Sequence, residues 1–459
     1  MKLAAASTAL ALSFAIGACH PSGARHSAQT TNIKSCAFEV SLAASGTARV
    51  AASCDADGPV SFHAPPRLLR DLHGLGKPRR GSFAASSGKL DYEVDLATLS
   101  TRARDIDLAA HLGDSFFAPM SNVLLTPEPL TTEIPVKVHV TADPGLTAAT
   151  GLARAKAPDT YQLMAHEIPV ATYFAFGKLE QRSHEIDGAR LDITRLDGAL
   201  DQPFDDIDAW IQTSARAVRD FYGAFPVPRA SVNVLPIPGR DAVIFGKVLP
   251  ESEPGVALLV GQHAARKSLY SDWILVHELF HLGFPSFFEE GKWLDEGLAT
   301  YYEPIIRVRA GLYTETELWH ELLENMPQGL PAFTSGGLEH AQDFRGIYWG
   351  GAIACLVADV EARKRRLDGG LEVGLRALRD AGGNACEVWT LAEVVGAVDH
   401  ALGAPTLAPI VAGHAKQGSA FDLPALFAAL GVNRDAHGAV QLSDSAPLAS
   451  VRRAITASP

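Results

Sequence analysis

Residues 277–281, with the sequence HELFH, carry the side chains best suited to chemistry. Two histidines four positions apart lie on one face of a helix, so His277 and His281 can reach the same metal ion. Glu278 lies one position round the helix, where its carboxylate can accept a proton from water activated by that metal. Burying these groups without partners would cost on the order of several kcal/mol, and a metal removes that cost. The pattern predicts a hydrolytic zinc site with Glu278 as the general base.

A catalytic zinc site needs a third protein ligand and keeps one coordination position open. Residues 293–299, with the sequence WLDEGLA, offer a carboxylate on the next predicted helix. Glu296 shares one helix face with Thr300 and Glu303. We therefore predict that Glu296 is the third ligand and that Glu303 supports a ligating histidine through a hydrogen bond. The alternative interpretation is a pair of core helices whose His and Glu residues are incidental.

Two helices must position these groups, one over about residues 268–283 and one over about 292–309. Upstream of them, residues 205–221 show apolar side chains at helical spacing. Residues 231–235 and 255–261 are short apolar runs that indicate buried strands. The metal helices therefore belong to a region that mixes helices and strands.

The patterning divides the 459-residue chain into several regions. Residues 36–204 contain alternating segments typical of strands and indicate a β-rich N-terminal domain. Residues 205–312 contain the metal motif, and the apolar spacing over residues 313–440 predicts a helical C-terminal domain. Residues 441–459 are assigned to a tail. Four helices are expected after the metal motif, over residues 348–366, 371–381, 390–402 and 423–430.

The N-terminus has the features of an export signal. Residues 3–16 form an apolar stretch after Lys2, and small residues follow it. Residues 16–19 resemble a bacterial lipobox, which implies a signal peptide over 1–18, a lipid on Cys19 and a tether over 19–35. His20 stands where retention signals place Asp, so the resemblance implies an outer-membrane anchor facing the periplasm. The alternative is a plain secretory signal with an incidental cysteine.

The remaining four cysteines permit three pairings. In an oxidising compartment we expect the near pairs Cys36–Cys54 and Cys355–Cys386, and free buried thiols are the alternative. None has neighbours at zinc-ligand spacing. The chain is 47% hydrophobic with a net charge of -12, so it can bury cores and lacks the basic footprint of a nucleic-acid partner.

The segments HELFH and WLDEGLATYYE together resemble those of the gluzincin metallopeptidases. Within that group the chain resembles the M1 aminopeptidases and, more closely, the M61 glycyl-aminopeptidase-like group. Residues 220–226 resemble the start of the family's catalytic domain, and residues 348–352 resemble its Tyr-x-Lys-Gly helix. The resemblance implies a multidomain α+β chain with an N-terminal β-sandwich-like module, a thermolysin-like zinc catalytic domain and a C-terminal helical domain.

The resemblance also implies residue roles and a substrate. His277, His281 and Glu296 become zinc ligands, Glu278 becomes general base and proton shuttle, and Tyr348 becomes the hydroxyl donor to the oxyanion. The implied activity is zinc-dependent hydrolysis of peptide bonds in a peptide or protein, with the membrane contacted through Cys19.

The sequence also departs from the family pattern. Gly350 stands where the family has Lys, and the short spacing before Glu296 leaves Glu289 and Glu290 as weaker substitute ligands. Residues 255–263, which precede the zinc helix, hold no carboxylate to anchor a substrate amine. The similar segment 336–340 (GGLEH) lies downstream and is interpreted as coincidence. The missing amine anchor favours one alternative, a catalytically weak or inactive gluzincin-fold binding or scaffold protein. The resemblance leaves a second one open, another hydrolysis at the same zinc site, for which the sequence offers nothing specific.

Overall fold

The computed structural model describes residues 31–458 except residues 86, 104, 132, 251–252 and 288–289. The predicted signal peptide, Cys19 and most of the tether lie outside the described residues. Within the described part of the chain, no helix combines the length and the apolarity needed to cross a membrane.

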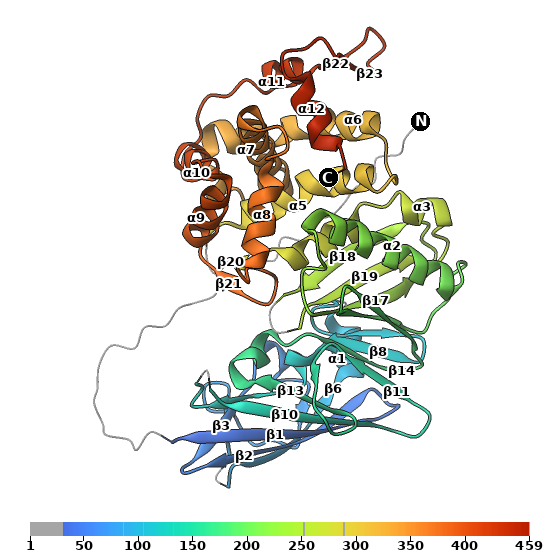
Figure 1. Ribbon diagram of the computed structural model, residues 1–459. Coiled ribbons are helices and arrows are strands. Elements are labelled where there is room, and N and C mark those ends of the chain that lie inside the picture. Colours follow the sequence, from blue (N-terminus) through green and yellow to red (C-terminus); the bar gives the residue numbers. More distant parts are fainter. Residues whose placement is uncertain are drawn as a thin grey trace.

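The N-terminal region is built from three β-sheets, and it forms the lower part of the molecule in Figure 1. The largest is a seven-stranded sheet in the order β12 (Ala153–Arg154), β13 (Thr160–Met164), β10 (Pro135–Ala142), β1 (Ile33–Leu42), β2 (Thr47–Ala56), β6 (Lys89–Asp95) and β4 (Leu72–His73). A four-stranded sheet has the order β11 (Thr147–Thr150), β14 (Tyr173–Gly177), β8 (Ser115–Pro119) and β7 (Ala110–Leu112). A three-stranded sheet has the order β5 (Ser82–Ala85), β3 (Val60–His63) and β9 (Thr126–Glu128).

These sheets enclose one core because alternate residues of their strands are apolar. Phe38, Phe62 and Phe176 come from the three different sheets and belong to that core. The helix α1 (Leu96–Ala103) follows β6. The predicted β-rich N-terminal region is confirmed.

A five-stranded mixed sheet forms the middle of the molecule (Figure 1). Its order is β15 (Glu180–Ile186), β16 (Ala189–Arg195), β17 (Arg229–Ile237), β19 (Gly255–Gly261) and β18 (Val243–Leu249). The boundary that we expected at residue 205 therefore falls inside this unit, because the β15–β16 hairpin pairs with β17 in register. β18 is an edge strand that pairs only with β19 among the described strands.

The helices that contact this sheet, together with those stacked above them, form the upper part of the molecule (Figure 1). They are α2 (Phe204–Tyr222), α3 (Arg266–Tyr270), α4 (Ile274–Phe280), α5 (Lys292–Arg309), α6 (Glu315–Asn325), α7 (Gly351–Arg365), α8 (Leu371–Asp380), α9 (Leu391–Leu402), α10 (Leu407–His414), α11 (Leu423–Leu430) and α12 (Ala449–Thr456). Two short parallel strands, β20 (Ser286–Phe287) and β21 (Val388–Trp389), form one small sheet, and β22 (Val432–Arg434) and β23 (Val440–Leu442) form another.

One hydrophobic core runs through the middle and C-terminal regions, from Ile186 to Ile455. The assignment of residues 441–459 to a tail is wrong, because α12 buries Val451 and Ile455 in this core. The predicted helical C-terminal region is otherwise confirmed, and local signals explain some of its helix starts. Thr314 and Thr390, for example, each begin a helix with a reciprocal capping box.

Two predicted helices differ from the observed ones. The helix expected over 268–283 is divided into α3, α4 and a 3₁₀ turn that starts at His281. The helix expected from residue 348 begins as α7 at Gly351, and a π-helical turn over Arg345–Gly350 precedes it. The third predicted helix, over residues 292–309, is observed with the same bounds as α5.

The cysteines confirm one predicted pair and contradict the other. Cys36 and Cys54 lie opposite each other on β1 and β2 and form a disulfide. Cys355 and Cys386 are free thiols. Cys355 is completely buried within α7, whereas Cys386 lies in the loop before β21, so the pairing by sequence distance was wrong.

Candidate metal centre

Neighbouring elements hold the two histidines rigidly. His277 belongs to α4, and His281 opens the 3₁₀ turn that continues it. The Asp272 carboxylate accepts a hydrogen bond from the Leu275 amide and so caps the start of α4. At the other end, the buried Tyr222 hydroxyl of α2 donates to the Phe280 carbonyl at 3.1 Å. Both imidazoles are therefore held by a short segment that is fixed at each end.

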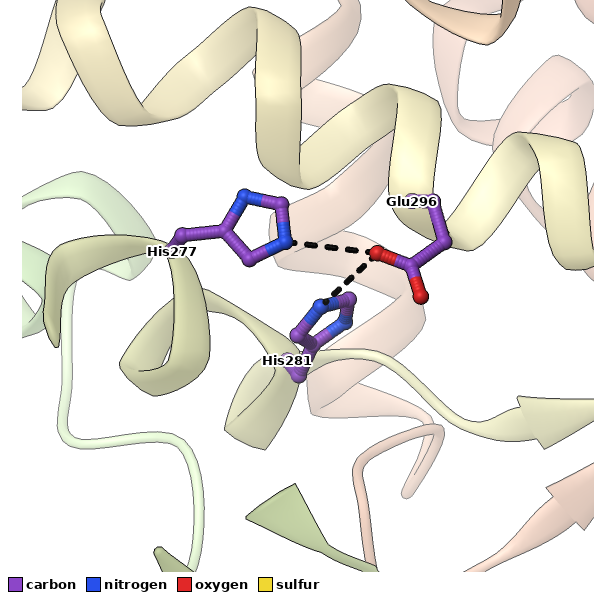
Figure 2. Close-up of side chains that lie close together, drawn as sticks. All are labelled: His277, His281 and Glu296. Atoms are coloured by element: carbon purple, nitrogen blue, oxygen red, sulfur yellow. Dashed lines mark hydrogen bonds and ion pairs between the residues drawn. The ribbon is translucent and has the colours of Figure 1, made fainter. Parts of the chain in front are cut away.

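The side chains of His277, His281 and Glu296 converge between α4 and α5 (Figure 2). Glu296 Oε2 lies 3.3 Å from His277 Nε2 and 3.7 Å from His281 Nε2. One donor atom from each residue lies within 4.8 Å of the others. Ligands about 2.0–2.1 Å from a tetrahedral metal lie roughly 3.3–3.4 Å apart, whereas N–H···O bonds cluster near 2.9–3.0 Å. The donor set and its spacing therefore fit a metal ion.

Asp295 supports this arrangement from the far side of His281. Its Oδ1 atom lies 2.7 Å from His281 Nδ1, which leaves Nε2 facing Glu296. Such a carboxylate fixes the orientation of a ligating imidazole. We expected this role for Glu303, and that expectation is wrong because the Glu303 carboxylate is buried against Arg307 at 3.2 Å. Asp295 was missed although it directly precedes Glu296 in the sequence.

The charges around the site favour a cation. Burial raises the pKa of Glu296, but hydrogen bonds with His277 and His281 outweigh it, so the pKa is lowered and the carboxylate is ionised. Burial alone would lower the pKa of His281, but the carboxylates of Asp295 and Glu296 raise it well above its ordinary value. The carboxylates thus favour a positive charge beside them in this buried place, and a divalent cation would supply it.

Glu278 lies beside the cluster and is held by strand β18. Its Oε2 atom accepts a hydrogen bond from the Val248 amide at 2.9 Å. Burial raises the pKa of its carboxyl group, while His277 and His281 lower it, and the net pKa is raised. A raised pKa makes this carboxylate a better proton acceptor near neutral pH.

Strand β18 approaches α4 closely at Gly246. A Cβ atom there would lie 2.7 Å from Glu278 Cγ and 2.5 Å from Ile274 Cγ2. Sequence reasoning took residues 255–263 as the segment that faces the site, and this is corrected: β18 is the edge strand beyond β19, and its Val248 amide is the group that contacts Glu278 of α4. A glycine inside a strand is a known sign of such close approach. β18 holds no carboxylate either.

Tyr348 reaches the site from the π-helical turn before α7. Its ring stacks on the His277 ring at a centroid distance of 5.6 Å and an interplanar angle of 4°. The approach of α7 to α5 depends on two glycines, since a Cβ on Gly297 would lie 2.4 Å from the Gly351 backbone. Burial, followed by the nearby Glu296 and Glu278 carboxylates, raises the pKa of Tyr348. Its hydroxyl therefore stays protonated and can donate a hydrogen bond.

The other acidic candidates have different places. Glu290 lies 3.6 Å from Lys416 in an exposed ion pair, and Glu289 lies outside the described residues. Glu339, in the segment interpreted as coincidence, accepts hydrogen bonds from the Gly291 amide at 3.2 Å and from Trp293 Nε1 at 2.6 Å. It thus fixes the start of the helix that carries Glu296.

The fold is similar to those of known zinc metallopeptidases. An aminopeptidase N family protein from Idiomarina loihiensis aligns over 90% of this chain and 82% of its own, with a TM-score of 0.66 and 14% sequence identity. A mutant of a two-domain M1 zinc metallopeptidase, bound to L-arginine, aligns over 85% of this chain and 96% of its own, with a TM-score of 0.50 and 13% identity. No protein-family model matches the chain, and no curated protein matches it.

At these identities the likeness concerns the fold. It confirms the expected multidomain α+β architecture and the resemblance to gluzincin aminopeptidases at that level. The closer resemblance to the M61 group stays a prediction.

Proposed function

We propose that this protein is a zinc metallopeptidase that hydrolyses peptide bonds. The observation that carries the proposal is the convergence of His277, His281 and Glu296 beside a fixed Glu278 carboxylate. Two imidazoles and one carboxylate are a known ligand set of catalytic zinc, which keeps one position open. The similar folds of M1 zinc metallopeptidases support the same function.

The chain's own residues divide the work of hydrolysis. Zinc held by the three ligands would supply Lewis acidity, which lowers the pKa of water and polarises a peptide carbonyl. Glu278 takes the proton from the attacking water and later delivers it to the leaving amine. The Tyr348 hydroxyl donates a hydrogen bond to the oxyanion that develops on the carbonyl oxygen. Asp295 keeps His281 in the orientation that a ligand needs.

The second candidate is a catalytically weak or inactive gluzincin-fold binding or scaffold protein. The observation that favours it is the lack of a carboxylate on both β18 and β19, the two strands beside α4. In this case the metal would be retained for structure alone.

Glu278→Gln separates the two candidates. We expect the variant to keep its zinc, measured by elemental analysis, and to lose about 10²–10⁴-fold in turnover on a defined peptide mixture. Glu290→Gln serves as the matched control, because that glutamate pairs with Lys416 at the surface. Undiminished turnover in Glu278→Gln would remove the proposed base. Wild-type protein that holds zinc but cleaves no peptide would favour the scaffold.

We propose further that the protein is exported and lipid-anchored through Cys19. The apolar segment and lipobox-like residues before Cys19 support this proposal, as does the Cys36–Cys54 disulfide, because such bonds persist in oxidising compartments. Expression in a bacterial host with a radiolabelled fatty acid should label the wild-type protein and not Cys19→Ser. A wild-type protein that remains unlabelled and keeps residues 1–18 would overturn the proposal.

A further inference from the structure

The strand that fixes Glu278 is supported on one side by the sheet and on the other by the N-terminal region. Within its sheet, β18 pairs only with β19 among the described strands, and its register shifts between Val243 and Phe245. An edge strand with such an irregularity is held less firmly than a central one. The position of the Val248 amide therefore depends on what else contacts β18.

An ion pair between modules provides this second support. Lys247 directly precedes Val248 on β18. Its Nζ atom lies 2.5 Å from Asp107 Oδ2 of the N-terminal region. Both side chains are about two-thirds buried, with 33% and 30% of their surfaces exposed. A partly buried pair is screened less by solvent than a surface pair.

The Asp107 loop is itself fixed to the N-terminal core. The completely buried Asn122 donates through Nδ2 to the carbonyls of Asp107 and Leu108 at 2.8 and 2.9 Å. The Asp107 amide donates to Asp105 Oδ1 at 2.9 Å. Asp107 is therefore presented by a rigid turn rather than by a loose loop.

The N-terminal region also packs against the sheet that contains β18. Tyr173 of β14 is completely buried in a small core that includes Leu235 of β17 and Ala257 of β19. Leu249 of β18 packs against the same core, so the N-terminal region also contacts the strand that carries the Val248 amide.

We propose that Asp107 and Lys247 are positioning residues: the N-terminal region clamps edge strand β18 through this ion pair, so that the Val248 amide holds Glu278 in its catalytic orientation. This inference rests on the proposed peptidase function. It gives the N-terminal region a role in catalysis that needs no contact with substrate. Small displacements of a reacting group can lower rates by about 10²-fold.

The test compares three variants of the full-length protein: Asp107→Asn, Lys247→Met and the swapped pair Asp107→Lys with Lys247→Asp. We expect each single variant to lower kcat about tenfold, with KM changed less than about twofold and zinc content unchanged. The swapped pair should recover most of the lost kcat. Glu93→Gln, which breaks the exposed Arg49–Glu93 pair on β2 and β6, is the control and should leave both constants unchanged.

Hydrogen exchange provides a readout that does not depend on activity. In metal-free protein, the amides of residues 243–249 should exchange faster in Asp107→Asn than in wild type, while those of α5 should not. Unchanged exchange together with unchanged kcat would overturn the inference. A higher KM with unchanged kcat would overturn it as well, because it would assign the pair to substrate binding. A single variant that fails to fold leaves the other single variant and the swapped pair as tests.

The failure of this inference differs from the failure of the proposed function. If wild-type protein cleaves peptides and the Asp107 and Lys247 variants behave like it, only the positioning role is lost. If wild-type protein cleaves no peptide, the proposed function fails, and the exchange of residues 243–249 still reports whether the clamp exists.

Discussion

Two clusters of buried polar groups lie among the helices, and they differ in how their buried charges are compensated. One is the metal centre between α4 and α5. The other, here called the charge cluster, consists of Arg309, Asp359, Arg363 and Glu372. Both lie among apolar side chains of the same hydrophobic core.

The charge cluster is balanced by the protein itself. Arg363 lies 3.1 Å from Asp359 and 2.8 Å from Glu372, and Arg309 lies 2.9 Å from Glu372. The Leu371 amide also donates to Asp359 at 2.6 Å. Two guanidinium groups thus face two carboxylates, so the cluster has no surplus charge.

The metal centre is not balanced in this way. Two imidazoles, which carry no charge when they bind a metal, face the carboxylates of Glu278, Asp295 and Glu296. No arginine or lysine contacts these carboxylates within the described residues. The comparison teaches that carboxylates without an arginine or lysine partner distinguish a cation site from a cluster that is balanced by its own side chains.

The largest expected effect tests the charge cluster. Arg363→Met removes one cation and leaves Asp359 and Glu372 buried with too few partners, so we expect a loss of about 3–5 kcal/mol in the free energy of unfolding. Denaturant titration measures it, and Arg366→Met is the control because that arginine is exposed beside Asp368. Zinc affinity of the folded variant should be unchanged. Wild-type stability in Arg363→Met would mean that the cluster is not held by internal charge balance.

The second-largest expected effect tests the Tyr348 hydroxyl, which belongs to the metal centre. Tyr348→Phe removes one hydroxyl donor to the oxyanion, and we expect kcat to fall about 10²–10³-fold. Zinc content and the unfolding free energy should stay close to the wild-type values, because the ring still stacks on His277. Tyr270→Phe, on α3, is the control. Full activity in Tyr348→Phe would show that this hydroxyl does not act in the reaction.

The sequence predicted those features of the site that depend on local spacing. The four-residue spacing of His277 and His281 is set by one helix turn, and the bounds of α5 followed from its apolar periodicity. Glu296 could be assigned because a third ligand was required. The residue spacing within one helix therefore predicts two of the three metal-binding residues.

Features that depend on tertiary packing were missed. Glu303 and Asp295 are both acids on α5, and only the packing of α5 against α4 decides which one meets His281. The place of β18 beside Glu278 follows from strand order, which no local pattern in residues 243–249 reveals. The distance between Cys355 and Cys386 in the sequence likewise says nothing about which elements separate them.

The smallest of the three effects sharpens the comparison within the metal centre. Asp295 is not one of the three residues whose donor atoms converge on the metal position. Its Oδ1 atom lies 2.7 Å from His281 Nδ1, so its charge acts on the metal through the imidazole. Asp295→Asn preserves shape and removes that charge, and we expect zinc affinity to fall about 10–100-fold in a competition titration against a chelator. Because zinc binds the folded state, the same variant should gain less thermal stability from added zinc than wild type gains.

Asp380→Asn is the matched control, since that carboxylate pairs with Arg379 at the surface. An Asp295→Asn protein with wild-type zinc affinity would mean that His281 needs no carboxylate to orient it. The surplus negative charge would then reside in Glu278 and Glu296 alone, and the contrast with the charge cluster would rest on the ligands themselves rather than on their supporting residues. A fall in affinity with unchanged stability of the metal-free protein would instead place Asp295 among the groups that make this cluster a cation site.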